Sequence, residues 1–109
     1  MKILTRLCLF LLAGVLAACG APTAEPETIE FTVTDPPAPA ERIEVDLGAE
    51  VTLRITAAID DRAHLHGYEI EKDLVAGEPT DLVFTADMAG TYEVESHVTD
   101  AVWINLVVK

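Results

Sequence analysis

The histidines in the second half of the chain are the residues best suited to chemistry. His64 and His66 are separated by a single residue. On a β-strand such a pair points to the same face, about 6.6 Å apart. Two neutral imidazoles placed this way can bind one ion of zinc or copper. His97 is a third candidate ligand. Glu95 shares a face with His97 and is expected either to bind the ion or to accept a hydrogen bond from an imidazole N–H.

The elements that carry these residues are predicted to be β-strands, because apolar residues alternate with polar ones through most of the chain. The alternating segments are 29–33, 43–47, 51–55, 64–70, 82–84 and 92–94, and a more apolar segment follows at 101–108. Turn-forming residues such as Asp35-Pro36-Pro37 and Ala89-Gly90 separate them. About seven short strands at this spacing predict an all-β fold, a β-sandwich.

Three segments of the second half stand in a recognisable order. His66-Gly67-Tyr68-Glu69-Ile70 comes first, the turn Ala76-Gly77-Glu78 follows, and Gly90-Thr91-Tyr92-Glu93-Val94-Glu95-Ser96 precedes a last strand. This order, over residues 50–109, resembles the cupredoxins, the small sandwich domains of blue-copper proteins. The resemblance implies a Greek-key β-sandwich in which His66 takes the place of the first copper histidine. It also implies that His64, His66 and His97 converge at one pole of the sandwich.

The chain departs from the cupredoxin pattern at the copper ligands. Ser96 stands where the family has its cysteine, and the loop that would carry a second histidine and a methionine is nearly absent. Met88 lies before the Gly90-Thr91-Tyr92 segment rather than after the ligand loop. Blue copper needs a short Cu–thiolate bond. We therefore expect a domain that lacks the blue-copper Cys and Met ligands and is not a blue-copper electron carrier.

Three interpretations of the histidines stay open. All three form one site with an open fourth position, or His64 and His66 bind a metal with other ligands, or the histidines bind no physiological metal and bond to backbone carbonyls. The alternation bears on His97, because Tyr92, Val94 and Ser96 share the parity expected to face the core. His97 is therefore expected to face outward unless the strand bulges there.

The start of the chain has the order of a bacterial export signal. Lys2 and Arg6 precede an apolar run from Leu7 to Leu16, which is too short to span a bilayer. The Leu16-Ala17-Ala18-Cys19 sequence that ends it resembles the lipobox of bacterial lipoproteins. The resemblance implies that residues 1–18 are removed and that Cys19 receives a diacylglycerol and a further acyl chain. Two or more chains give stable membrane anchoring.

The remaining chain is expected to have two parts, a lipidated Cys19 with a flexible tether over 19–28 and a sandwich over 29–109. Gly20, in place of an Asp, favours the outer membrane in a cell that has two membranes. Removal of residues 1–18 takes two of the seven basic residues and none of the 19 acidic ones, so the formal charge changes from −12 to −14. Such a domain repels nucleic acid and attracts cations.

The pattern of reactive residues argues against an enzyme. The sequence has no phosphate-binding loop, no G-x-S-x-G and no H-E-x-x-H. Apart from Cys19, the part after the signal has no cysteine and hence no disulfide. The predicted function is a lipid-anchored module of the cell envelope that binds a copper or zinc ion through His64, His66 and His97. The alternative is an accessory sandwich that binds no metal and contacts another envelope protein.

Overall fold

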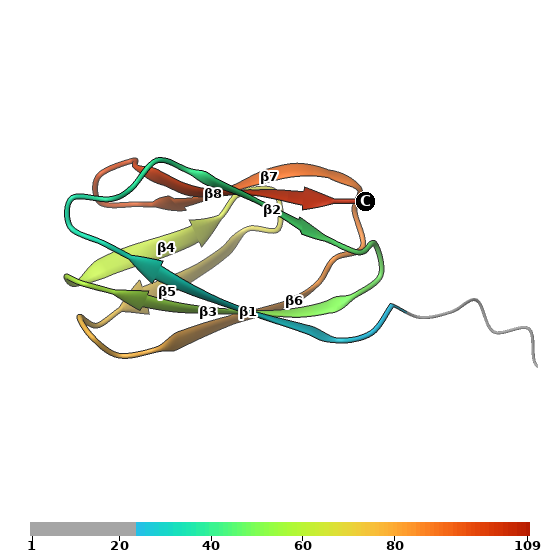
Figure 1. Cartoon of the computed structure of the whole chain (residues 1–109), viewed down its shortest axis with the longest axis horizontal. Coiled ribbons are helices and arrows are strands. Elements are labelled where there is room, and N and C mark those ends of the chain that lie inside the picture. Colours follow the sequence, from blue (N-terminus) through green and yellow to red (C-terminus); the bar gives the residue numbers. More distant parts are fainter. Residues whose placement is uncertain (1–23) are drawn as a thin grey trace, which may run out of the picture.

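The computed structural model describes residues 24–109, which form two facing β-sheets (Figure 1). The eight strands are β1 (Glu27–Val33), β2 (Glu41–Val45), β3 (Glu50–Ala57), β4 (Asp61–Leu65), β5 (Ile70–Leu74), β6 (Thr80–Thr85), β7 (Gly90–Ser96) and β8 (Val102–Val108). The prediction of an all-β Greek-key sandwich is confirmed, with eight strands where about seven were expected. None of the described residues forms a helix long and apolar enough to cross a membrane.

One sheet has three strands, in the order β1-β3-β6, and the other has five, in the order β2-β8-β7-β4-β5. Two neighbouring pairs, β1 with β3 and β2 with β8, are parallel, and the other pairs are antiparallel. In Figure 1 the three-stranded sheet forms the lower layer, while β2, β7 and β8 lie in the upper one. Only β4–β5 and β7–β8 are hairpins within one sheet, since every other connection crosses between the sheets.

The core lies between the sheets because alternate residues of each strand point inward. In β3, Val51, Leu53 and Ile55 are at most 1% exposed, and the residues between them are half-buried. Phe84 of β6 and Val94 of β7 are also buried. The other members of the core are Val33, Val45, Ala49, Ala57, Ala63, Leu65, Leu74, Leu82, Ala86, Trp103, Ile104, Leu106 and Val108. Tyr92, predicted to be buried with this set, is half-buried at the edge of the core.

The predicted single strand over 64–70 is wrong. Strand β4 ends at Leu65, a turn follows, and β5 begins at Ile70. Gly67 makes the turn possible, since its φ is +90° and a Cβ there would lie 2.4 Å from a ring carbon of Tyr92. Only glycine fits such a position. The turn places His66 just beyond the end of β4, so His64 and His66 are not successive same-face residues of one strand.

The first strand begins at Glu27, two residues before the expected start of the sandwich. The start of β1 and the C-terminal end of β8 lie at the same end of the molecule (Figure 1). The loops β1–β2, β3–β4, β5–β6 and β7–β8 lie at the opposite end, which we call the loop end. The predicted signal over 1–18 and the lipidated Cys19 lie outside the described residues.

Candidate metal centre

His64 lies at the centre of a row of three side chains that crosses the five-stranded sheet. In the strand register it stands directly opposite Glu71 of β5 on one side and Glu95 of β7 on the other. Its neighbours Ala63 and Leu65 belong to the core, so the alternation of the strand turns His64 to the outer face of the sheet. The histidines therefore meet on this outer face, whereas the cupredoxin resemblance implied a pole of the sandwich.

His64 is only 5% exposed although it faces outward, because other polar side chains cover it. Its Nδ1 lies 3.4 Å from Oε1 of Glu95, and its Nε2 lies 3.3 Å from Oε2 of Glu69. A neutral imidazole has one N–H and can donate to only one of these carboxylates. The other ring nitrogen then presents a lone pair to a negatively charged oxygen. That arrangement is favourable only when a proton or a metal ion lies between the two atoms.

His66 and Glu95 complete one set of donors around His64. The rings of His64 and His66 are nearly perpendicular, at 81°, with centroids 5.5 Å apart. One donor atom from each of His64, His66 and Glu95 can be chosen so that all lie within 4.8 Å of one another. Three atoms bound to one zinc ion at 2.0–2.2 Å in a tetrahedral arrangement lie about 3.3–3.6 Å apart. The side chains of the set would therefore move together by up to about 1.5 Å to bind an ion.

His97 belongs to a second set, made with His64 and Glu71 at the same spacing. It follows the last residue of β7, and its backbone N–H donates to the carbonyl of Arg62 at 2.8 Å. Its ring lies over that of His64 with centroids 4.3 Å apart and planes at 32°. Its Nδ1 is 2.7 Å from Oε1 of Glu71. Within residues 24–109, two sets share His64, and no set at this spacing contains all three histidines.

The strand alternation placed His97 correctly on the outside. Val94 and Ser96 are fully buried, and His97 is exposed on the opposite side. The pairing of β7 with β8 is irregular between Val94 and Glu95, one step before this region. No bulge at His97 is needed to bring it to His64, because both side chains already face outward.

Two carboxylates next to the histidines were not anticipated from the sequence. Glu69 reaches His64 from the β4–β5 turn, and Glu71 contacts His97 from β5. Gly67 is the sequence feature that could have indicated these two carboxylates, because a glycine inside an alternating segment often marks an interruption of the strand. A hairpin centred on that glycine pairs Glu71 with His64 across the strands. The nearby carboxylates of Asp60 and Asp61 are engaged in structural hydrogen bonds, with the Ala76 N–H and the Ser96 hydroxyl.

The two donor sets differ in the charged partners of their carboxylates. Arg62 lies 3.7 Å from Glu71 and 3.4 Å from Asp73, so Glu71 already has two partners, Arg62 and His97. The carboxylate of Glu95 contacts His64. The Gly67 N–H, and after it the ring of His64, hold the pKa of Glu69 below its ordinary value. Glu69 is therefore an ionised hydrogen-bond acceptor near neutral pH.

Ser96, at the position where cupredoxins have cysteine, has a structural role. Its hydroxyl donates to Oδ1 of Asp61 at 2.6 Å. The Oγ of Ser96 also accepts the backbone N–H groups of Val98 and Thr99 at 3.1 and 2.9 Å. The fully buried serine thus closes the β7–β8 turn and ties it to the start of β4.

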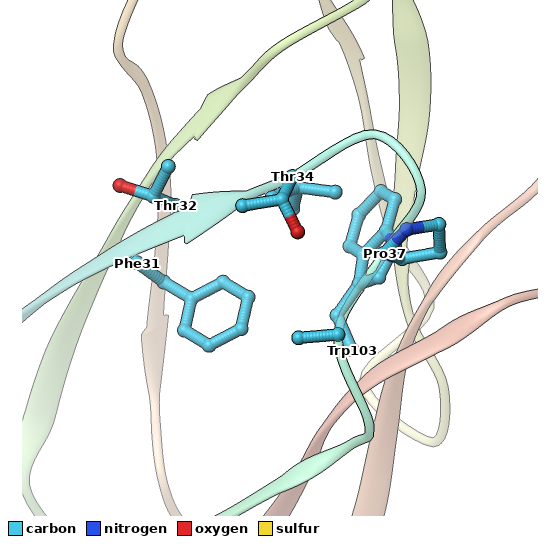
Figure 2. A pocket seen from close by; sticks show the side chains of 7 residues that line it. Phe31, Thr32, Thr34, Pro37 and Trp103 are labelled. Carbon is cyan, nitrogen blue, oxygen red and sulfur yellow. The ribbon is translucent and has the colours of Figure 1, made fainter.

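The hollows of the surface lie away from the histidines. One, of about 20 Å³, lies between β1 and the following loop, with Phe31, Thr34, Pro37 and Trp103 around it (Figure 2). That volume holds about one water molecule. A neighbouring hollow of about 40 Å³ reaches Ile59 and Thr99 at the loop end. No histidine lines either hollow, so the histidine cluster of residues 24–109 lies outside both.

By sequence, the chain matches no protein-family model and no curated protein. By structure, it is similar to a copper binding protein in the apo form, with a TM-score of 0.60 and 15% identity over 83% of this chain and 100% of that one. It is also similar to a mutant of amicyanin in its Cu(I) state, with a TM-score of 0.53 and 19% identity over 81% of this chain and 95% of that one.

Similar domains also occur inside larger proteins. The multicopper oxidase mgLAC gives a TM-score of 0.61 at 19% identity over 79% of this chain, which spans 39% of mgLAC. A heme-copper terminal oxidase gives 0.60 at 18% identity over 76% of this chain, which spans 65% of that one. At these identities the similarity shows the fold. The chain is a β-sandwich with a cupredoxin-like fold.

Proposed function

We propose that this domain is a lipid-anchored module of the cell envelope that binds one copper or zinc ion at His64, His66 and Glu95. The observation that carries the proposal is the environment of His64, a buried imidazole with a carboxylate oxygen near each ring nitrogen. A cation between His64 and Glu95 would satisfy the nitrogen that has no proton. The cupredoxin-like fold supports the proposal, because two structures with this fold are of copper proteins.

The set with Glu95 is the preferred position for the ion. Glu95 is half-buried and has no arginine partner among residues 24–109, whereas Glu71 is held by Arg62 and His97. Two imidazoles and one carboxylate leave a fourth position open, a donor set that suits Zn(II) or Cu(II). His97 lies over His64 and would shield the site while leaving it accessible from the surface.

The bound ion would not form a blue-copper centre, and the domain would bind rather than catalyse. Both cysteines of the chain, Cys8 and Cys19, precede the described residues, so no strand of the sandwich supplies a thiolate. Ser96 is the single serine of the chain, and its buried hydroxyl is already bonded to Asp61. His97 faces the opposite side from Ser96 and cannot act as its general base.

The envelope location rests on the lipobox-like sequence that ends at Cys19. Acyl groups on Cys19 would hold the sandwich at a membrane, and Gly20 favours the outer membrane where two membranes exist. The acidic surface would attract metal cations and repel nucleic acid. The expected partners are therefore a metal ion, the membrane and an envelope protein that gives or takes the metal.

The test is calorimetric titration of the metal-free protein with Cu(II) and Zn(II). We expect one ion per chain, with tighter binding of Cu(II) in accordance with the Irving–Williams order. The Cu(II) form should show weak d–d absorption and no intense thiolate band. Affinity should fall as the pH drops through about 6.5, where free imidazole takes up a proton, because each imidazole must be neutral to bind.

The histidine variants locate the site. His64→Ala should weaken binding most, because His64 belongs to both sets, although the cupredoxin pattern would place the largest loss at His66. Glu95→Gln should also weaken binding. Glu93→Gln is the matched control, since this exposed residue of β7 belongs to neither set. If all three single histidine-to-alanine variants bind as tightly as the parent, the binding is adventitious and the proposal is wrong.

A second candidate function is supported by a different surface. At the loop end, Ile59, Val75 and Val98 are 46%, 52% and 68% exposed. The loops carrying Ile59 and Val75 are joined by a hydrogen bond from the Ala76 N–H to Asp60 at 2.8 Å. These apolar side chains are compatible with an accessory sandwich that contacts another envelope protein without a metal. A negative result in the titration would favour this function.

A further inference from the structure

Glu69 has a backbone conformation that a residue with a side chain rarely adopts. Its φ is +54°, in the left-handed region that favours glycine. Within residues 24–109, Asp100, with φ of +62°, is the other non-glycine residue with this property. Aspartate is several-fold enriched in that region, whereas glutamate is not. A strained backbone that the surrounding structure maintains often marks a functional position.

The contacts of the Glu69 side chain suggest why a glutamate is kept there. Its Oε1 accepts the N–H of Gly67 at 3.2 Å, and its Oε2 lies 3.3 Å from Nε2 of His64. The side chain is 71% exposed, so it does not stabilise the core by burial. What it provides is a carboxylate beside one particular nitrogen of the buried histidine.

We propose that Glu69 is a positioning residue that fixes the tautomer of His64 for metal binding. Its carboxylate accepts the Nε2–H, which leaves Nδ1 as the nitrogen with the lone pair. Nδ1 is the atom that faces Oε1 of Glu95 at 3.4 Å, where the ion is proposed to bind. The role in binding rests on the function proposed above, but the tautomer itself is a property of the metal-free protein.

The geometry distinguishes this role from direct ligation. The closely spaced donor sets contain Glu95 or Glu71, and neither contains Glu69. Glu69 instead lies on the far side of the imidazole from Glu95, since the two carboxylates approach different ring nitrogens. A carboxylate that accepts the second N–H of a metal-binding histidine orients the ring and raises its basicity.

The test compares two substitutions that relieve the same backbone conformation. Glu69→Gly removes the carboxylate and places a residue suited to positive φ in the turn. Asp100→Gly is the matched control, because it exchanges an acidic residue for glycine at φ +62° in the β7–β8 turn, and Asp100 belongs to neither donor set around His64. Both variants should fold, and thermal unfolding verifies this. If Glu69→Gly is unstable, Glu69→Asn repeats the test with another residue common at positive φ.

Two measurements are made on each protein. Imidazole ¹⁵N NMR of the metal-free protein at about pH 8, where free imidazole is neutral, gives the tautomer of His64. Zn(II) titration gives the affinity. The parent and Asp100→Gly should show the Nε2–H tautomer, and Glu69→Gly should lose that preference. Zn(II) affinity should fall about 10–100-fold in Glu69→Gly, as for other residues that orient a metal ligand, and stay at the parental value in Asp100→Gly.

The outcomes separate this inference from the proposed function. If His64 keeps the Nε2–H tautomer in Glu69→Gly, the inference is wrong, whether or not metal binds. It is also wrong if Glu69→Gly and Asp100→Gly change the Zn(II) affinity equally. If the parent binds no metal while Glu69→Gly still changes the tautomer, the metal-binding function fails and the tautomer control by Glu69 stands.

Discussion

At the scale of single residues, Ser96 and His97 are neighbours that face opposite sides of the five-stranded sheet. Ser96 is buried and accepts two backbone N–H groups of the following turn, while His97 lies outside over His64. The turn held by Ser96 sets the direction in which His97 leaves β7. The inner hydroxyl therefore supports the position of the outer imidazole.

Ser96→Ala should lower the free energy of unfolding by about 1–3 kcal/mol. The substitution removes the acceptor of the two partly buried turn N–H groups and one of the donors to the half-buried carboxylate of Asp61. Chemical denaturation of parent and variant measures the change. Thr91→Ala, an exposed position of the same strand, is the control and should lie within about 0.5 kcal/mol of the parent. Equal stability of Ser96→Ala and the parent would contradict the role given to this hydroxyl.

The sequence indicated which residue types could bind a metal, but not how they would be arranged. His64, His66, His97 and Glu95 were identified because imidazoles and carboxylates are scarce ligands whose spacing can be examined directly. Their meeting place depends on cross-strand register, which the sequence does not display. Glu69 reaches His64 only because the backbone turns at Gly67, and that turn is a tertiary feature shaped by the ring of Tyr92.

At the scale of elements, the period of two predicts strands well where one face is buried. In β3 and β6 the alternation is regular, and the inward residues form the core. The period fails over 64–70, because the apolar spacing continues through a turn that the chain makes at Gly67. The hairpin formed there brings Glu71 opposite His64 and so creates the row of ligand-type side chains.

Phe84→Ala should lower the free energy of unfolding by about 3–5 kcal/mol, from lost burial and the cavity left behind. Phe84 is 7% exposed and packs against the ring of Tyr68, with centroids 5.0 Å apart. For a small domain this is a large part of the total stability. Val83→Ala is the matched control, because Val83 is next to Phe84 on β6 but 53% exposed, and its effect should be within about 0.5 kcal/mol. Denaturant titration measures the free energy of unfolding of both variants and the parent. Similar decreases for both variants would mean that the inner face of β6 is assigned wrongly.

At the scale of the whole molecule, the sandwich has two ends and one face that carries the histidines. The strand that begins the described chain starts at the same end as the C-terminus, and the loops that carry Ile59, Val75 and Val98 lie at the other (Figure 1). The histidines lie on the outer face of the five-stranded sheet, between these ends. A tether attached at Cys19 would therefore leave both the histidine face and the loop end accessible to a partner.

The proposed lipid anchor is tested by Cys19→Ser. We expect this variant to accumulate as uncut, unlipidated precursor, because acyl transfer to the side chain needs a thiolate and cleavage follows that step in bacterial lipoproteins. Intact-mass spectrometry of protein extracted from membranes should show acylated Cys19 as the N-terminus of the parent. Cys8→Ser is the matched control, since Cys8 lies in the apolar run that is expected to be removed, and it should give the same mature mass as the parent. A mature parent protein that begins at another residue, or that begins at Cys19 without acyl groups, would show that the sandwich is exported without a lipid anchor.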